Sequence, residues 1–329
     1  MTVKSNRCAA LTRHISAGLL LGLSASADAQ TIYPSKPIRI VSPYPAGGTT
    51  DIMARLVGPK LTEAWGQPVI VDNRPGGNTV IGTEAMVKSP ADGYTLLSIL
   101  SSHVIVPNLA PTPYDVIKDF AAVATIANTQ LVLVIHPSLP ARNLQQLIAL
   151  AKSKPGQLNY GSGGSGTVTH LAGEFFNMQA GVKTQHIPYK GSIPALTDTV
   201  GGQIHMYYSP PIVAIGHIKS GRLVALASTG DSRLTALPAV PTAGEAGLKG
   251  FALNVWYGFL AQVATPRPVI DKLSTEITRI LSLPDIREKL SSQGMDPFIS
   301  TPDQFAALIK TDHAKYANII KSAKIKLEQ

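Results

Sequence analysis

The chain has 329 residues, of which 44% are hydrophobic and 15% are charged, so it can bury a sizeable core and is not a disordered polypeptide. Its net charge of +9 falls to +7 without residues 1–29, which hold three basic residues and one acidic residue. The basic residues are scattered and are not interleaved with aromatic residues, which argues against nucleic-acid binding. A modest positive charge favours the approach of small anions.

Residues 1–29 have the pattern of a secretory signal peptide. A basic start precedes the short apolar run ISAGLLLGLSA, and Ala27-Asp28-Ala29 supplies the small residues of a cleavage site. The apolar run is too short to span a membrane. Because Cys8 is the only cysteine, the exported chain would contain none. That excludes disulfides, thiolate metal sites and a cysteine nucleophile.

Strand-like and helix-like segments alternate after this leader. We predict strands over 36–42, 67–73, 94–100, 130–137, 157–163, 184–189, 204–209 and 223–229. We predict helices over 51–65, 143–156, 169–181, 192–202, 268–281 and 305–320. The last of these follows a capping box at Thr301–Gln304. The alternation indicates α/β units with parallel sheets.

The first strand and the first helix are joined by the stretch SPYPAGGTTD, residues 42–51. A plain connection does not need two prolines and two glycines, whereas glycine is required where the backbone takes φ > 0 or lets a ligand come close. The helix that follows presents free N–H groups and the positive end of its dipole. This turn therefore predicts a binding site for an anion.

A second turn, within NYGSGGSGTVTHLAGEFF (residues 159–176), repeats the same plan of strand, glycine-rich turn and helix. It contains G-x-G-x-x-G at Gly161–Gly166, but the acidic residue that would hold a ribose about 20 positions later is missing. We therefore expect no dinucleotide cofactor; a plain tight turn and a small-anion site are the alternatives. Two such turns that face each other would form an anion-binding cleft.

Catalytic and metal-binding motifs are absent from the sequence. There is no P-loop, no G-x-S-x-G and no H-E-x-x-H, and the histidines are dispersed. Asp51 and Arg55 stand four residues apart on one helix, which indicates an ion pair, with ligand contact by Asp51 as the alternative. These observations predict a binding protein without a metal or cofactor rather than an enzyme.

Several segments resemble the Bug family, the extracytoplasmic solute receptors of tripartite tricarboxylate transporters. The resemblance is carried by YPSKPIRIVSPYPAGGTTDIMARLV (33–57), GQPVIVDNRPGGNTVIGTEAM (66–86), LNYGSGGSGTVTHLAGEFF (158–176) and HIPYKGSIPALTDTVGGQI (186–204). Further matches continue in order to WYGFLA (256–261). The resemblance covers the whole chain after the leader.

The resemblance implies a periplasmic binding protein with an α/β fold, in which mostly parallel sheets flanked by helices form two lobes that close on a ligand (a type II-like, Venus-flytrap arrangement). Lobe one would comprise residues 30–127 and 250–329, and lobe two residues 128–249. The crossings near residues 127–131 and 249–253 would act as hinges. The implied protein delivers a small organic carboxylate to two membrane subunits of the transporter, and we expect it to be a monomer without cofactors. A receptor that presents its ligand to a membrane sensor and an exported hydrolase are the alternatives.

The candidate ligand-binding residues come from both turns and from the segments beside them. They are Tyr44, Ala46, Gly47, Gly48, Thr49, Asp51, Ser101, Ser162, Gly163, Ser165, Gly166, Thr167, His170, Lys190, Tyr208 and Ser209. The segment HMYYSP offers no carboxylate to pair with an ammonium group, and a buried unpaired charge is costly. We therefore predict a mono- or dicarboxylate without an amino group, aromatic acids included.

Overall fold

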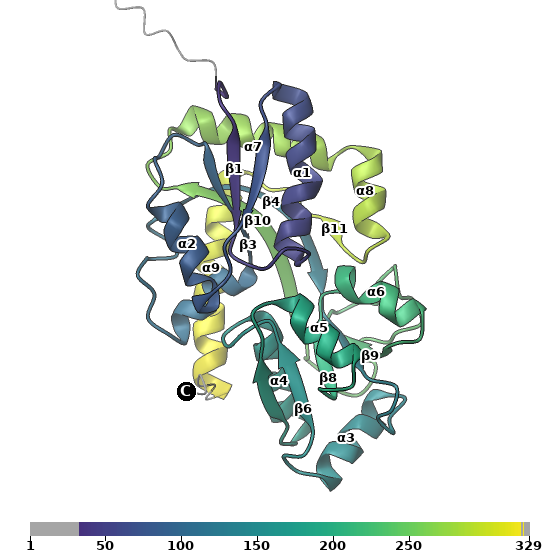
Figure 1. The fold of residues 1–329 in the computed structure, drawn as a ribbon. Coiled ribbons are helices and arrows are strands. Elements are labelled where there is room, and N and C mark those ends of the chain that lie inside the picture. Colours follow the sequence, from purple (N-terminus) through teal and green to yellow (C-terminus); the bar gives the residue numbers. More distant parts are fainter. Residues whose placement is uncertain (1–32, 324, 326–329) are drawn as a thin grey trace, which may run out of the picture. The chain divides into compact units, whose positions relative to one another are not determined.

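The computed structural model describes residues 33–323 and 325, and it arranges their strands in two sheets (Figure 1). The predicted signal peptide lies outside the described residues. The six-stranded sheet has the order β11-β4-β10-β3-β1-β2. Its strands are β1 (Ile38–Ser42), β2 (Val69–Asn73), β3 (Thr95–Leu100), β4 (Phe120–Gln130), β10 (Asn254–Gln262) and β11 (Asp296–Pro297). The five-stranded sheet, in the order β7-β6-β8-β5-β9, comprises β5 (Val132–Ile135), β6 (Asn159–Ser162), β7 (Gln185–Pro188), β8 (Met206–Ser209) and β9 (Val224–Ser228).

Both sheets are mixed, which corrects the expectation of mostly parallel sheets. β1 runs parallel to β2 and β3, and β6 runs parallel to β7 and β8. In contrast, β10 is antiparallel to β3 and β4, and β5 is antiparallel to β8 and β9. The reason is the path of the chain: β4 leads out of the six-stranded sheet and β10 leads back into it, so these two neighbours run in opposite directions. The predicted α/β class is confirmed.

Helices pack against both sheets. Those that pack with the six-stranded sheet are α1 (Thr49–Trp65), α2 (Val80–Val87), α7 (Arg267–Leu281), α8 (Pro284–Ser291) and α9 (Pro302–Ala323). The part of the molecule that contains the five-stranded sheet holds α3 (Leu144–Ser153), α4 (Val168–Ala180), α5 (Ser192–Val200) and α6 (Pro211–Lys219) (Figure 1). Three short 3-10 helices are η1 (Gly77–Thr79), η2 (Ser101–Val104) and η3 (Val106–Asn108). The predicted helices are all present, whereas α2, α6 and α8 were not predicted.

The ends of the predicted helices follow the expected local chemistry. Helix α1 buries Met53, Leu56 and Leu61 at helical spacing and ends at Gly66, which has φ +67°. The capping box before α9 is confirmed: Gln304 N donates to Thr301 Oγ1 at 3.2 Å, and Thr301 N donates to Gln304 Oε1 at 2.9 Å. Local sequence therefore sets where these helices begin and end.

Two central strands, β4 and β10, were not predicted. β4 is rich in alanine, which has a low strand propensity, and β10 is a buried apolar run without alternation. Tertiary packing explains both compositions. A Cβ at Gly258 of β10 would lie 2.4 Å from Phe305 Cζ, so α9 approaches the sheet more closely than a larger residue would permit.

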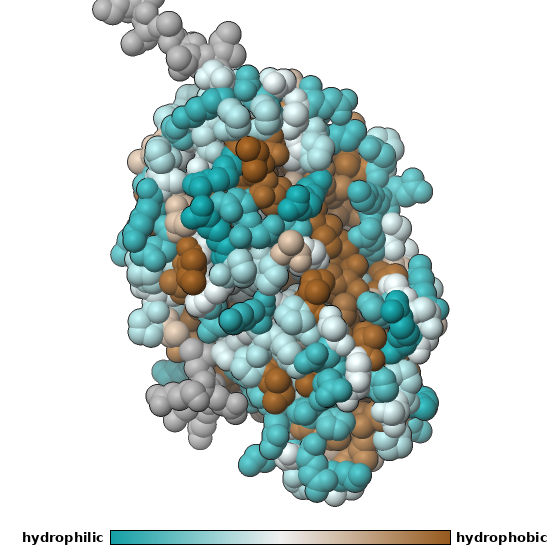
Figure 2. Space-filling view, viewed as in Figure 1, coloured by the Kyte–Doolittle hydropathy of each residue, from teal (hydrophilic) through white to brown (hydrophobic). Residues whose placement is uncertain are grey.

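The surface in Figure 2 is mostly hydrophilic, with hydrophobic residues between the lower end of α1 and α6. The large hydrophobic side chains with the highest exposure are dispersed along the chain: Ile70, Ile81, Met178, Val263 and Ile299. Across residues 33–323, no helix has the length and apolar character needed to cross a bilayer. Single exposed apolar residues of this kind are normal on a protein surface.

Candidate functional site

The first glycine-rich turn connects β1 to α1 with the geometry that its sequence predicts. Gly47 has φ +78°, a conformation that L side chains rarely adopt. Gly48 is the N-cap of α1 and provides no side-chain cap, so the first N–H groups of α1 keep their donor capacity. Thr49 Oγ1, at the first position of the helix, is buried and makes no hydrogen bond within the described part of the chain.

Asp51 supports this turn from within the helix. Its carboxylate accepts hydrogen bonds from Gly47 N at 2.9 Å and from Arg55 Nε at 3.0 Å, which confirms the predicted ion pair. Asn73 extends the network, because its Nδ2 donates to Tyr44 O. Burial raises the pKa of Asp51, but the hydrogen bonds from Arg55 and Gly47 outweigh it and hold the pKa below its usual value. The carboxylate is thus engaged by its own chain.

The second turn, between β6 and α4, also contains a glycine in the left-handed conformation, since Gly166 has φ +81°. Several backbone N–H groups of this turn already donate hydrogen bonds to nearby side chains. Gly163 N donates to Thr169 Oγ1, Gly164 N to Ser162 Oγ, and Gly166 N to His170 Nδ1. Thr167 caps α4, and the turn therefore has fewer free N–H groups than its sequence predicts.

Two stacked histidines lie behind the second turn. The rings of His170 and His186 are 4.0 Å apart at 23°, and His186 Nε2 lies 2.6 Å from Ser162 Oγ. Burial lowers the pKa of His170 to about 4, and burial and the neighbouring His170 lower that of His186 to about 3. Both rings are neutral near pH 7, so His170 Nδ1 can accept from Gly166 N.

We expect acid to destabilise the protein through this pair. Because the folded-state pKa values lie below the usual 6.5, the unfolded state binds protons first, and stability falls as the pH drops from about 6.5 to about 3. Thermal unfolding across this range measures the effect. His170→Asn keeps an acceptor for Gly166 N but does not titrate, so its midpoint should depend less on pH. An identical pH profile for wild type and variant would contradict the assignment.

A cavity of about 240 Å³ lies between the two turns. It is lined by Pro43, Tyr44, Pro75, Gly76, Gly77, Asn78, Thr79, Gly163, Thr167, Tyr189 and Lys190. A smaller space of about 20 Å³ adjoins it, because Tyr44, Gly163 and Thr167 line both. We call these the outer and inner cavities. The inner cavity has room for about one water-sized group.

The inner cavity is closed by residues from both sheets. Besides the three shared residues it is lined by Leu100, Ser102, Leu131, Val168, Thr169, Ser192, Pro210 and Tyr257. Val168 N donates to Ser102 Oγ at 3.1 Å, which links the starts of α4 and η2. A Cβ at Gly191 would lie 2.8 Å from Pro45 Cδ, so the first turn also touches the start of α5. Like α1, α5 has a glycine N-cap, Gly191, and no side-chain cap.

Buried tyrosine hydroxyls gather beside the inner cavity. Burial raises the pKa values of Tyr44, Tyr207 and Tyr257, and the neighbouring hydroxyls of Tyr207 and Tyr44 raise the pKa of Tyr257 further. They therefore remain protonated hydrogen-bond donors. Tyr257 lies near Thr49 and Tyr207 near Ser192, yet the Tyr207 hydroxyl makes no hydrogen bond of normal geometry among the residues described. Unpartnered buried hydroxyls are costly unless a ligand uses them.

The remaining predicted residues lie at varying distances from these cavities. Tyr208 points to the other face of β8 and packs between Phe176 and Phe251. Ser209 is buried and donates to Pro210 O. Ser101 is buried near Tyr316, and Lys190 is exposed at the outer cavity. The residues of the list that do not line either cavity are Ala46, Gly47, Gly48, Thr49, Asp51, Ser101, Ser162, Ser165, Gly166, His170, Tyr208 and Ser209.

Sequence reasoning missed Ser192, Tyr207 and Tyr257. Ser192 begins α5 after the glycine of PYKGS, a signal of the same kind as in the two recognised turns. Tyr207 neighbours the predicted Tyr208, and alternation along a strand places the two side chains on opposite faces. Tyr257 lies on β10, a strand that was not predicted, so no local signal identified it.

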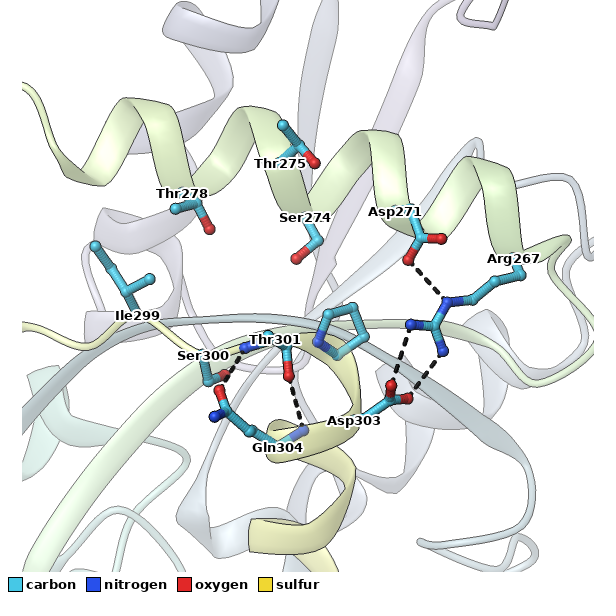
Figure 3. Close-up of a pocket in the computed structure, with 11 residues that line it drawn as sticks. Arg267, Asp271, Ser274, Thr275, Thr278, Ile299, Ser300, Thr301, Asp303 and Gln304 are labelled. Carbon is cyan, nitrogen blue, oxygen red and sulfur yellow. Dashed lines mark hydrogen bonds and ion pairs between the residues drawn. The ribbon is translucent and has the colours of Figure 1, made fainter.

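A larger cavity of about 540 Å³ lies between α7 and the start of α9 (Figure 3). Arg267 pairs there with Asp271 and Asp303, each at 2.8 Å. These groups are exposed, and their charges are already matched. None of the lining residues belongs to the predicted site, so volume alone does not identify the binding site.

Comparisons with known proteins place the chain in a family of transporter receptors. The model of the family described as "Tripartite tricarboxylate transporter family receptor" matches residues 53–325. Protein BugT of Bordetella pertussis is 37% identical over 310 residues, 93% of this chain and 95% of that protein.

Two solved structures with bound acids are similar as well. An R. palustris protein solved with adipate has a TM-score of 0.87 and 31% identity, and the match covers 89% of this chain and 99% of that one. MatC from Rhodopseudomonas palustris, solved with bound malate, has a TM-score of 0.83 and 26% identity, with 88% and 100% covered. The predicted resemblance to Bug-family receptors is thereby confirmed.

Proposed function

The chain belongs to the tripartite tricarboxylate transporter receptor family, and on this premise we propose that it is a periplasmic receptor for a small organic carboxylate. Its relatives are receptors, and we propose that this chain likewise performs no catalysis. The observation that carries the proposal is the inner cavity, which is lined by Ser192 at the uncapped start of α5 and by the buried Tyr257. Near these two residues, the buried hydroxyls of Thr49 and Tyr207 make no hydrogen bond of normal geometry among the described residues. The adipate and malate complexes of similar proteins support it.

A carboxylate group fits the chemistry of the inner cavity. A carboxylate only accepts hydrogen bonds, and the free N–H groups of α1 and α5 and the hydroxyls of Tyr207, Tyr257 and Thr49 are donors. Helix N-termini add a favourable dipole without a cation. The volume of about 20 Å³ has room for about one oxygen atom of the carboxylate, so the rest of the ligand extends into the outer cavity.

We therefore revise the set of candidate residues. Direct contact is proposed for Tyr44, Gly48, Thr49, Gly163, Thr167, Ser192, Tyr207 and Tyr257, with Lys190 at the outer end. Support of the two turns is proposed for Gly47, Asp51, Ser162, Gly166 and His170. Tyr207 replaces Tyr208, because Tyr208 faces the core of its sheet.

Ligand capture is proposed to work by closure of two lobes, each built on one sheet. The chain passes between the sheets at Leu131 and within residues 229–253, close to the predicted boundaries at 127/128 and 249/250. Export through residues 1–29, a monomeric state and delivery to the membrane subunits of a tripartite transporter complete the proposal.

The ligand is proposed to lack an amino group. The residues that line the inner and outer cavities include no aspartate or glutamate, so an ammonium group there would have no anionic partner. Mono- and dicarboxylates, aromatic acids included, meet this requirement.

A thermal-shift screen followed by calorimetric titration tests the proposal. The panel holds C4–C6 dicarboxylates, benzene carboxylates, aspartate and glutamate. We expect simple acids to raise the unfolding temperature, since a ligand of the folded state stabilises it by RT ln(1 + [L]/Kd). Tight binding of an amino acid with the simple acids silent would contradict the ligand class. If no carboxylate of the panel raises the unfolding temperature or binds in the titration, the receptor function is contradicted.

A further inference from the structure

The chain passes between its two sheets through two crossings that lie side by side. At the first, only Leu131 separates β4 from β5. At the second, the chain leaves β9 at Ser228 and enters β10 at Asn254. Asn254 of β10 pairs with Gln130 of β4, and Ser228 of β9 pairs with Val132 of β5. Each crossing therefore begins or ends at a hydrogen-bonded pair of strands.

Thr229 is bonded to both crossings. Its backbone N–H donates to Leu131 O at 2.9 Å, and its carbonyl accepts from Leu253 N at 2.8 Å. Its hydroxyl accepts from Leu131 N at 2.9 Å and donates to Leu253 O at 2.7 Å. The side chain is 1% exposed. One residue therefore satisfies both backbone groups of Leu131 and both of Leu253.

Gln130 forms a second connection at the same place. Its Nε2 donates to Ser232 O at 2.7 Å, and its Oε1 accepts from Gly230 N at 3.0 Å. A Cβ at Gly230 would lie 2.1 Å from Gln130 Cδ, so a glycine is needed for this approach. The first crossing is thus held to the segment after β9 on both sides of Leu131.

Leu131 connects this arrangement to the ligand site, because it lines the inner cavity. A hinge works by a few residues that absorb the change in backbone torsion angles. Two parallel connections that are free of each other can twist independently. Two that share one buried hydroxyl must move together.

We propose that Thr229 is a positioning residue that couples the two crossings into a single hinge and so fixes how the lobes meet around the ligand. It acts through Leu131 and touches no ligand. This inference rests on the proposed lobe closure, but it does not depend on the identity of the ligand.

The test measures the distance between the lobes in ligand-free protein. Nitroxide labels are attached to cysteines placed at the exposed positions Glu63 and Lys183 in a Cys8→Ser background, and the distance distribution is recorded by double electron–electron resonance. Thr229→Val keeps the shape of the side chain but removes the hydroxyl. We expect its distribution to broaden, whereas Thr229→Ser, which retains a hydroxyl, should match wild type.

Thr125→Val is the matched control. Thr125 is also 1% exposed, and its hydroxyl likewise makes two hydrogen bonds, to Phe298 O and Ser300 Oγ, inside the six-stranded sheet. Its unfolding temperature should fall as for Thr229→Val, but its distribution should stay that of wild type. If both valine variants broaden alike, or neither does, the coupling role is overturned.

Thr229→Ala covers the case in which Thr229→Val does not fold. It removes the same hydroxyl without placing a methyl group against Leu131 N and Leu253 O. The same broadening is expected. A distribution identical to wild type would overturn the proposal. Because no ligand enters the experiment, a failure of the receptor function would be recognised separately, by the carboxylate screen.

Discussion

Gly47→Val is expected to weaken carboxylate binding by about 100-fold while the protein still folds. Gly47 has φ +78°, which a β-branched residue adopts only with strain of about 1–2 kcal/mol. Relief of that strain moves the turn and misplaces the N–H groups at the start of α1. Loss of one or two hydrogen bonds to a charged group, each contributing about 1.5–3 kcal/mol, accounts for the expected factor.

The matched control is Gly66→Val at the other end of the same helix. Gly66 has φ +67°, and no atom lies within 4 Å of the position its Cβ would take. The backbone strain, and hence the loss of stability, should be similar for both variants. Calorimetric titration should show normal affinity for Gly66→Val and lost affinity for Gly47→Val. Equal affinities would show that the first turn does not bind the ligand.

Tyr207→Phe is expected to weaken binding by roughly 10–100-fold without loss of stability. Among the described residues, the buried Tyr207 hydroxyl makes no hydrogen bond of normal geometry, and such a group costs about 1–3 kcal/mol. Its removal should leave the unfolding temperature unchanged or raised. The ligand, in contrast, would lose a donor to its carboxylate. This opposite response of stability and affinity is the mark of a hydroxyl retained for binding.

Tyr208→Phe, one residue further along β8, is the control on the other face of the strand. Tyr208 packs against Phe176 and Phe251 in the core of its sheet. We expect no change in affinity, since its hydroxyl lies away from the cavity. If Tyr208→Phe weakens binding and Tyr207→Phe does not, the assignment of the two tyrosines is reversed.

The first turn could be predicted from sequence because its requirements are local. Two glycines between a strand and an amphipathic helix give both the backbone conformation and the free N–H groups. The sequence predicted the glycine-rich backbone of the second turn, but it did not predict which of its N–H groups are free. Its N–H groups are occupied by Ser162, Thr169 and His170, and the geometry of such side-chain bonds does not follow from spacing.

The opposite wall of the inner cavity depends on long-range pairing. Alternation along β8 places Tyr207 and Tyr208 on opposite faces of the strand, and the pairing of Val134 with Tyr207 in the neighbouring strand β5 sets which of the two lies near Ser192. Tyr257 reaches the cavity only because β10 returns between β3 and β4. An alanine-rich β4 gives no local signal for that arrangement.

A crystal structure of the protein with the acid that binds most tightly in the screen tests the central claim most directly. We predict one carboxylate with an oxygen atom in the inner cavity, within hydrogen-bond distance of the Tyr207 or Tyr257 hydroxyl and of an N–H group at the start of α1 or α5. The rest of the ligand should extend past Tyr44 into the outer cavity. A ligand that leaves these donors untouched, or that occupies the cavity between α7 and α9, would contradict the account.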